Sequence, residues 1–169
     1  MELTNAQLKL LYQSVIKQLA HPDPVGYIAR ALLETGGDPM YYGADDRVGF
    51  MPIDPWVAVE QTGISNMTDL NDNVMATVMV DKINFKKYGS IDSMIRAFQF
   101  GENEANNDQS VKINAFIKSV NDTRSSVLEI VEPRMATLKD VITILEQSIK
   151  SSEPKPIVTR FVKQVLEGV

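Results

Sequence analysis

The stretch ALLETGGDPMYYG, residues 31–43, starts as one face of a helix and ends in two glycines and a proline. Glycine adopts the left-handed conformation that closes a helix, and proline cannot continue one. Upstream, Asp23 and Pro24 have the order of an N-cap followed by a first helical residue. The sequence therefore predicts a helix that starts at Pro24 and ends at one of the two glycines. Glu34 falls in its last turn, where a carboxylate faces the negative end of the helix dipole.

The same start and stop signals recur along the first part of the chain. Apolar residues at helical spacing, with capping residues before them, predict further helices over about residues 5–19, 55–62, 70–88 and 91–100. Glycine follows the last three of these segments. No alternating strand pattern is present, although a small hairpin could lie between Met40 and Ile53. The predicted fold class is all-α.

Composition excludes several classes of protein. The 169 residues include 17 lysines and arginines against 22 acids, a net charge of −5, and no cysteine. No segment is strongly basic, so we expect neither nucleic-acid binding nor an electrostatic membrane anchor. A disulfide scaffold and a thiol nucleophile are excluded. No stretch approaches the roughly 20 apolar residues of a membrane span, and the first segment lacks the apolar run of a signal peptide.

A change of composition divides the chain. The polar run GENEANND, residues 101–108, precedes apolar residues that alternate at spacings of three and four. We therefore predict a first domain over 1–107 and an amphipathic helical extension over 108–169. An apolar stripe of this kind must be covered, either by the first domain's own surface or by a second copy or another protein. We predict that residues 109–169 bind other assembly proteins.

Three short motifs stand in order: ETGGDP (34–39), GFMPIDP (49–55) and RAFQFG (96–101). Their order and spacing resemble the soluble lytic transglycosylase and goose-type lysozyme family. That family typically reads E-S-x-x-x-P, then G-L-M-Q-I-x-P, then A-A-Y-N-A-G. The positions that match it are Glu34, Pro39, Gly49, Met51, Ile53, Pro55, Ala97 and Gly101, with Thr35 in place of serine and Phe50 in place of leucine.

The resemblance implies a lysozyme-like fold and cleavage of the glycan strands of peptidoglycan without a metal or other cofactor. Glu34 would act as general acid and then as general base, giving an anhydro-muramic product. Asp45, Asp46 and Asp54 are candidate second acids for a hydrolytic version of the reaction. The residues expected to bind substrate are Thr35, Tyr42, Gly49, Phe50, Met51, Phe98 and Gln99.

Departures from the family pattern support a second hypothesis. Pro52 stands where the family has glutamine, and Phe98 and Gln99 replace its Tyr-Asn pair. These changes favour a structural protein of a virion or secretion machine that keeps the fold without turnover. A third hypothesis is an unrelated helical adaptor, in which the motifs would be scattered. Under the first two hypotheses, Glu34, Met51 and Gln99 should line one groove.

The expected setting follows from the segment that begins the sequence. Since it does not have the pattern of a signal peptide, another route must bring the protein to a cell wall. We expect a bacteriophage protein, associated with the virion in a tail or baseplate, or one delivered to the periplasm or wall through a membrane pore.

Overall fold

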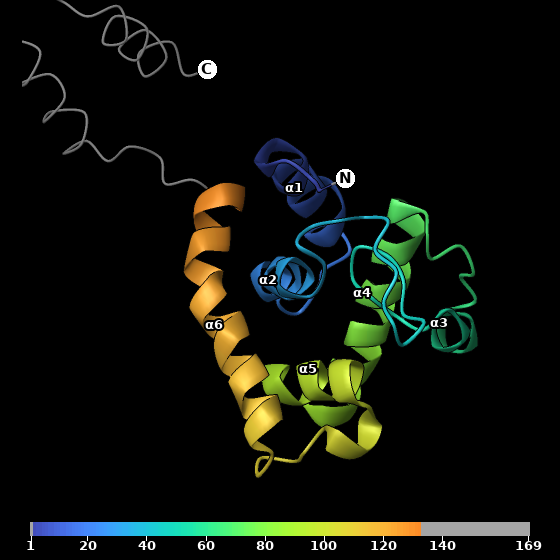
Figure 1. Cartoon of the computed structure of the whole chain (residues 1–169), viewed down its shortest axis with the longest axis vertical. Coiled ribbons are helices and arrows are strands. Elements are labelled where there is room, and N and C mark those ends of the chain that lie inside the picture. Colours follow the sequence, from blue (N-terminus) through green and yellow to red (C-terminus); the bar gives the residue numbers. More distant parts are fainter. Residues whose placement is uncertain (1, 133–169) are drawn as a thin grey trace, which may run out of the picture. The chain divides into compact units, whose positions relative to one another are not determined.

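The computed structural model describes residues 2–132, which form an all-α arrangement (Figure 1). In chain order, the helices are α1 Asn5–Leu11, the π-helix η1 Tyr12–Ile16, α2 Pro24–Thr35, α3 Pro55–Thr62, α4 Leu70–Tyr88, α5 Ile91–Phe100, the 3-10 helix η2 Glu102–Glu104 and α6 Val111–Val131. The described residues contain no strand. Where the sequence allows a hairpin, there are isolated bridges from Val48 to Tyr42 and to Ile53.

The predicted helix ends are confirmed where capping residues and glycines mark them. Asp23 accepts a hydrogen bond from the backbone N–H of Gly26 at the start of α2, and Gly36 closes that helix with φ +63°. In the same way, Asp54 caps the start of α3 and Gly63 closes its end. The first predicted helix differs, because its second half winds as the π-helix η1, where the Lys17 N–H donates to the carbonyl of Tyr12.

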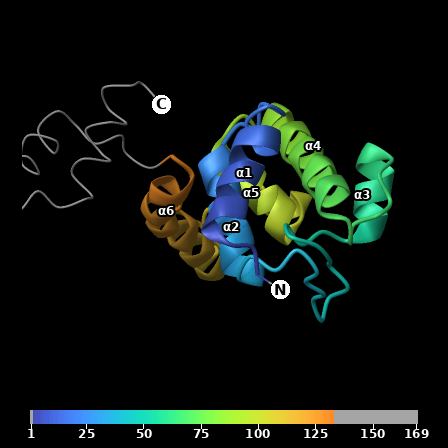
Figure 2. The same cartoon turned by 90° about the horizontal axis from the view of Figure 1, so that it is seen from above.

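Helix α2 lies at the centre of the unit that residues 2–132 form. Five consecutive side chains have no exposed surface: Tyr27, Ile28, Ala29, Arg30 and Ala31. A helix buried around its circumference needs neighbours on every side. Both views place α6 on one side of α2 and α4 on the other, with α3 farthest from α6 (Figures 1 and 2). The core therefore encloses α2 from Tyr27 to Ala31, one turn before Glu34.

Helix α6 packs into the same core as the helices before it. Five of its side chains are buried there: Ile113, Ile117, Val120, Val127 and Val131. Arg124 forms an ion pair with the Asp23 carboxylate, and Glu132 accepts hydrogen bonds from Tyr12 and Lys17. The structure therefore places α6 in one compact unit, Met1–Pro133, although the sequence predicts that an extension begins at residue 108. The rest of the predicted extension, 133–169, lies outside the described residues.

A fragment that ends at Asn107 should fail to fold, whereas one that ends at Glu132 should fold cooperatively. The shorter fragment loses the five buried aliphatic side chains of α6. At about 1.5 to 3 kcal/mol each, their burial is comparable with the whole stability of a typical domain, about 5 to 15 kcal/mol. Thermal unfolding followed by circular dichroism checks this. A cooperative transition in the shorter fragment would show that α6 is not part of the core.

A charged cluster is buried between α2 and α4. Asp81 forms an ion pair with Arg30 and a hydrogen bond with Nε2 of His21, the latter at 2.8 Å, and all three side chains are fully buried. His21 Nδ1 accepts the backbone N–H of Asp23 at 2.9 Å, so its Nε2 must carry the proton that it donates to Asp81. This cluster ties the start of α2 and the preceding turn to α4.

Candidate functional site

Glu34 lies in a cleft that four segments of the chain form together. Its side chain is 16% exposed, and the cleft has a volume of about 690 Å³. The last turn of α2, the loop that follows it, the end of α5 and the start of α6 supply the lining residues Glu34, Asp45, Arg47, Gln99, Phe100, Lys112 and Phe116. A partly enclosed carboxylate in a cleft of this size meets the first requirement for acid-base chemistry on a bound molecule.

Arg47 connects the two acids of the cleft. Its Nη2 lies 3.6 Å from Oε2 of Glu34, and its Nε donates to Oδ2 of Asp45 at 2.7 Å. The hydrogen bond from Arg47 lowers the pKa of Asp45, which is therefore ionised at neutral pH. The third nitrogen, Nη1, is buried and has no hydrogen-bond partner. Sequence reasoning missed Arg47, which belongs to none of the three motifs.

Asn73 holds the loop of the second motif in place. Its side-chain oxygen accepts the N–H of Met51 at 3.0 Å, and its amide nitrogen donates to the carbonyls of Val48 and Met51, both at 3.2 Å. The Thr35 hydroxyl donates to the carbonyl of Ala31 at 2.7 Å and lies 3.3 Å from that of Phe50. The first and second motifs are thus in contact, and α4 fixes the second.

Gly49→Ala should destabilise the protein by roughly 2 to 5 kcal/mol, because left-handed strain and overpacking act together. Gly49 has φ +96°, and a Cβ there would lie 2.1 Å from Nδ2 of Asn73 and 2.7 Å from the carbonyl of Met67. Gly63→Ala is the matched control, because Gly63 has φ +77° with nothing within 4 Å of a Cβ. Chemical unfolding of both variants measures the difference. Equal losses of unfolding free energy in the two variants would mean that the contact with Asn73 does not require glycine.

The third motif sends adjacent side chains in different directions. Gln99 and Phe100 line the cleft, and the Phe100 ring meets that of Phe116 edge-on, with centroids 5.6 Å apart. The Phe98 ring packs instead against the guanidinium of Arg30, 5.2 Å from the ring centroid. Phe98, predicted to bind substrate, therefore does not line the cleft.

The other predicted binding residues lie in different surroundings. Phe50 and Met51 have no exposed surface, and Gly49 is buried. None of these three residues can therefore contact a molecule in the cleft. Tyr42 is 69% exposed and its hydroxyl donates to Asp46. The expected groove of Glu34, Met51 and Gln99 is thus correct for its first and last members, and wrong for Met51, which the anchored loop turns into the core.

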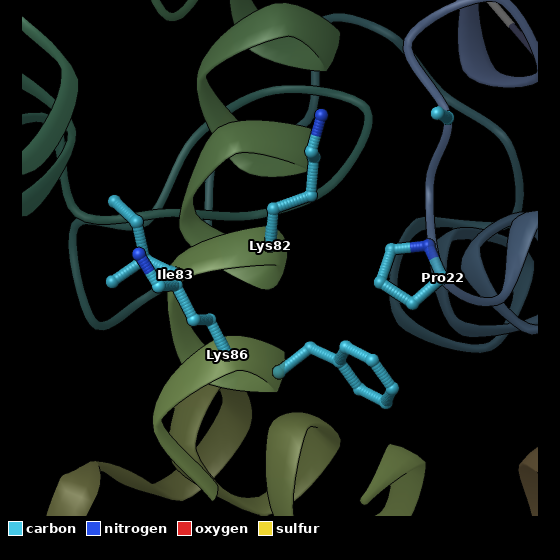
Figure 3. Close-up of a pocket in the computed structure, with 6 residues that line it drawn as sticks. Pro22, Lys82, Ile83 and Lys86 are labelled. Atoms are coloured by element: carbon cyan, nitrogen blue, oxygen red, sulfur yellow. The ribbon is translucent and has the colours of Figure 1, made fainter. Parts of the chain in front are cut away.

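Two other hollows in the described part of the chain lack an acid. One, of about 450 Å³, is lined by Ala20, Pro22, Lys82, Ile83, Phe85 and Lys86, and Figure 3 shows Lys82 and Lys86 on one helix with Pro22 across from it. Another, of about 300 Å³, lies between α1 and the start of α4. Neither is lined by a carboxylate, whereas Glu34 and Asp45 both line the cleft described above.

The described residues also bear on metals and membranes. No group of three or more histidine, cysteine, aspartate or glutamate side chains among residues 2–132 is placed to hold a metal ion. Within the same residues, no helix has the length and apolar character needed to cross a membrane.

Comparisons with known proteins found no match to any protein-family model, any curated protein or any solved structure. The resemblance to the lytic transglycosylase and goose-type lysozyme family therefore rests on the three motifs. The structure adds the contact between the first two motifs and the shared cleft of the first and third.

Proposed function

We propose that the protein cleaves glycosidic bonds in the glycan strands of peptidoglycan, with Glu34 as the proton donor and acceptor. The observation that carries this proposal is the position of Glu34, half-buried at a helix end and inside a cleft of about 690 Å³ that Asp45, Arg47 and Gln99 also line. Ligand sites in proteins commonly have volumes of about 300 to 1,000 Å³, so this cleft is large enough for a bound molecule.

The chemistry requires two proton transfers at Glu34, one from the carboxyl group and one back to it. Glu34 donates its proton to the glycosidic oxygen as the bond breaks, leaving an oxocarbenium-like sugar and a carboxylate. In the transglycosylase version, that carboxylate then takes the proton from a hydroxyl of the muramic sugar, whose oxygen bonds to the anomeric carbon. The product is an anhydro sugar, no water is consumed, and Glu34 is protonated again.

The hydrolytic version needs a second carboxylate, and the structure narrows the choice. Asp54 caps α3, and Asp46 accepts the hydroxyl of Tyr42. Asp45 lines the cleft together with Glu34 and is held by Arg47. Of the three aspartates predicted from the sequence, Asp45 is therefore the one placed to assist Glu34.

Arg47 must change its contact with Glu34 when a substrate binds. The separation of 3.6 Å is long for a charged hydrogen bond, whereas the bond to Asp45 is short at 2.7 Å. Arg47 can therefore stay bound to Asp45 while Glu34 turns toward the glycosidic oxygen.

A second candidate is an assembly protein of a virion or secretion machine that keeps this arrangement without turnover. Two observations favour it: Arg47 engages the Glu34 carboxylate, and Phe98 packs on Arg30 where the family has a phenol. Under either candidate, we propose a phage-borne protein that contacts other assembly proteins through residues 109–169, apart from the apolar face of α6, which the core covers.

Incubating the full chain with purified peptidoglycan of several chemotypes tests the choice. Release of soluble amino sugars above a heat-denatured control supports the enzyme. An absence of release from every chemotype, while a commercial lysozyme degrades the same samples, supports the assembly protein.

A further inference from the structure

We infer that copies of this protein associate head to tail, with Trp56 of one copy inserted into the hollow beside Lys82 and Lys86 on the next copy. Glu60, one turn after Trp56, then lies near the two lysine ammonium groups of that neighbour. This contact goes beyond the proposed function, because its two surfaces share no lining residue with the Glu34 cleft and do not depend on cleavage of a glycan.

The inserting surface is the outer face of α3. Trp56 is 76% exposed and Val59 is 41% exposed, whereas Ala58, on the opposite side of the helix, is buried in a cluster with residues of α4. Glu60 is also exposed and has no hydrogen-bond or ion-pair partner for its side chain among residues 2–132. Spacings of three and four residues place Trp56, Val59 and Glu60 side by side. Tryptophan with an apolar neighbour and an acid beside it is typical of a residue that becomes buried on binding.

The receiving surface is the hollow of about 450 Å³ between α4 and the turn before α2, where Pro22 lies across from the helix that carries both lysines (Figure 3). Lys82 donates to the carbonyl of Leu19 at 3.1 Å, and Lys86 has no partner for its ammonium group among residues 2–132. Like charges four residues apart on a helix repel each other. The apolar lining residues of the hollow are Ala20, Pro22, Ile83 and Phe85.

A second copy of the chain matches this hollow in chemistry and in charge. A tryptophan ring supplies about 150 to 250 Å² of surface to bury against the apolar lining. The Glu60 carboxylate supplies the opposite charge that Lys82 and Lys86 lack. Because the chain has a net charge of −5, two copies repel each other unless a cationic surface of one meets an acidic surface of the other. The charges therefore favour this contact over other contacts between copies.

The two surfaces differ, so the contact is heterologous. A pair of copies keeps a free Trp56 at one end and a free hollow at the other, and further copies can add to form a ring or a filament. The contact is smaller than a standard interface of about 1,600 Å², so we expect a dissociation constant of about 10 to 100 µM.

The fluorescence of Trp56 reports on the contact directly, because this is the only tryptophan in the chain. Raising the concentration of the full chain through the expected dissociation constant should shift the emission to shorter wavelength and raise the mass in sedimentation equilibrium. Trp56→Ala should weaken association by about tenfold or more. Tyr42→Ala is the matched control, because Tyr42 is another exposed aromatic residue and does not line the hollow, so this variant should associate like the wild type.

A mixture of two variants distinguishes a head-to-tail contact from any other. Trp56→Ala keeps the hollow, whereas Ile83→Asp keeps Trp56 but places a carboxylate in the hollow, where it repels Glu60. Each variant alone should remain monomeric, and the mixture should form a one-to-one complex. The emission of the single tryptophan in the mixture should then shift to shorter wavelength. Both substitutions are at partly exposed positions, and thermal melting establishes that each variant folds.

Reversal of single charges tests the electrostatic half of the contact. Glu60→Lys and Lys86→Glu should each weaken association by about tenfold, because each places like charges opposite each other. Three results would overturn the inference: an emission spectrum that does not change with concentration, association that survives Trp56→Ala, or a mixture that forms no complex. A full chain that stays monomeric at every concentration would assign the hollow to a different protein.

Discussion

Glu34→Gln should lower the rate of peptidoglycan cleavage by about 100- to 10,000-fold, the usual contribution of general acid-base catalysis. Glutamine has nearly the same shape but no transferable proton. The side chain is half-buried rather than part of the core, and its contact with Arg47 is long at 3.6 Å. We therefore expect the melting temperature of the variant to stay close to that of the wild type.

Release of dye from labelled peptidoglycan measures this effect. Glu129→Gln is the control, because Glu129 is exposed on α6 and does not line the cleft, so its substitution should leave the rate unchanged. If the Glu34 variant cleaved as fast as the control variant, the proton would have to come from another group.

Asp81→Asn should destabilise the protein by about 3 to 5 kcal/mol, the usual result of removing one partner from a buried ion pair. The carboxylate pairs with the Arg30 guanidinium and accepts from His21, and none of these side chains reaches solvent. The variant leaves the charge of Arg30 uncompensated in the core. Urea unfolding at neutral pH measures the loss, and a change below 1 kcal/mol would contradict it.

The loss of stability caused by Asp81→Asn should become smaller at low pH. Burial alone would raise the pKa of Asp81, but Arg30 and His21 outweigh it and hold that pKa below its ordinary value. A carboxyl whose pKa is lower in the folded state stabilises the protein above the unfolded value, about pH 3.9, and loses that contribution as pH falls toward the folded value. The stability gap between wild type and variant should therefore narrow below about pH 4. A gap that stays constant on acidification would show that Asp81 does not titrate in this way.

Helix ends could be predicted from the sequence because the signals are local. Asp23 caps α2 and Gly36 closes it through contacts within a few residues. The π-turn of η1 has no such signal. The sequence also has no local signal for the helices against which α6 packs. Apolar spacing indicates that one face of residues 111–131 is covered, but it does not identify α1 and α2 as the helices that cover it.

The residues of the cleft also fall into two groups, those that local motifs predict and those that only the packing of distant segments brings there. Glu34 and Gln99 were predicted from motifs, whereas Arg47, Lys112 and Phe116 reach the cleft through packing of distant segments. Lys112 and Phe116 belong to α6, which the sequence assigned to a separate extension.

One local feature of the sequence indicates a buried charge, whereas the second motif suggested a wrong position for two side chains. Arg30 interrupts the apolar run of α2, and an arginine inside such a run indicates a buried partner, here Asp81. Phe50 and Met51 were expected in the groove because their motif is a substrate-lining turn in the similar family. Asn73 instead anchors that turn from α4, and both side chains enter the core.

The mass of the fragments released from purified peptidoglycan tests whether Glu34 cleaves glycosidic bonds. We expect disaccharide-peptide fragments cut between sugars, with anhydro-muramic ends lighter by one water than hydrolysis products, and none from the Glu34→Gln variant. Fragments with hydrated ends would indicate that water, and not the muramic hydroxyl, attacks in the second step, with Glu34 still the acid in the first. Intact glycan strands, or cuts confined to the peptide bonds, would contradict glycosidic cleavage by this protein.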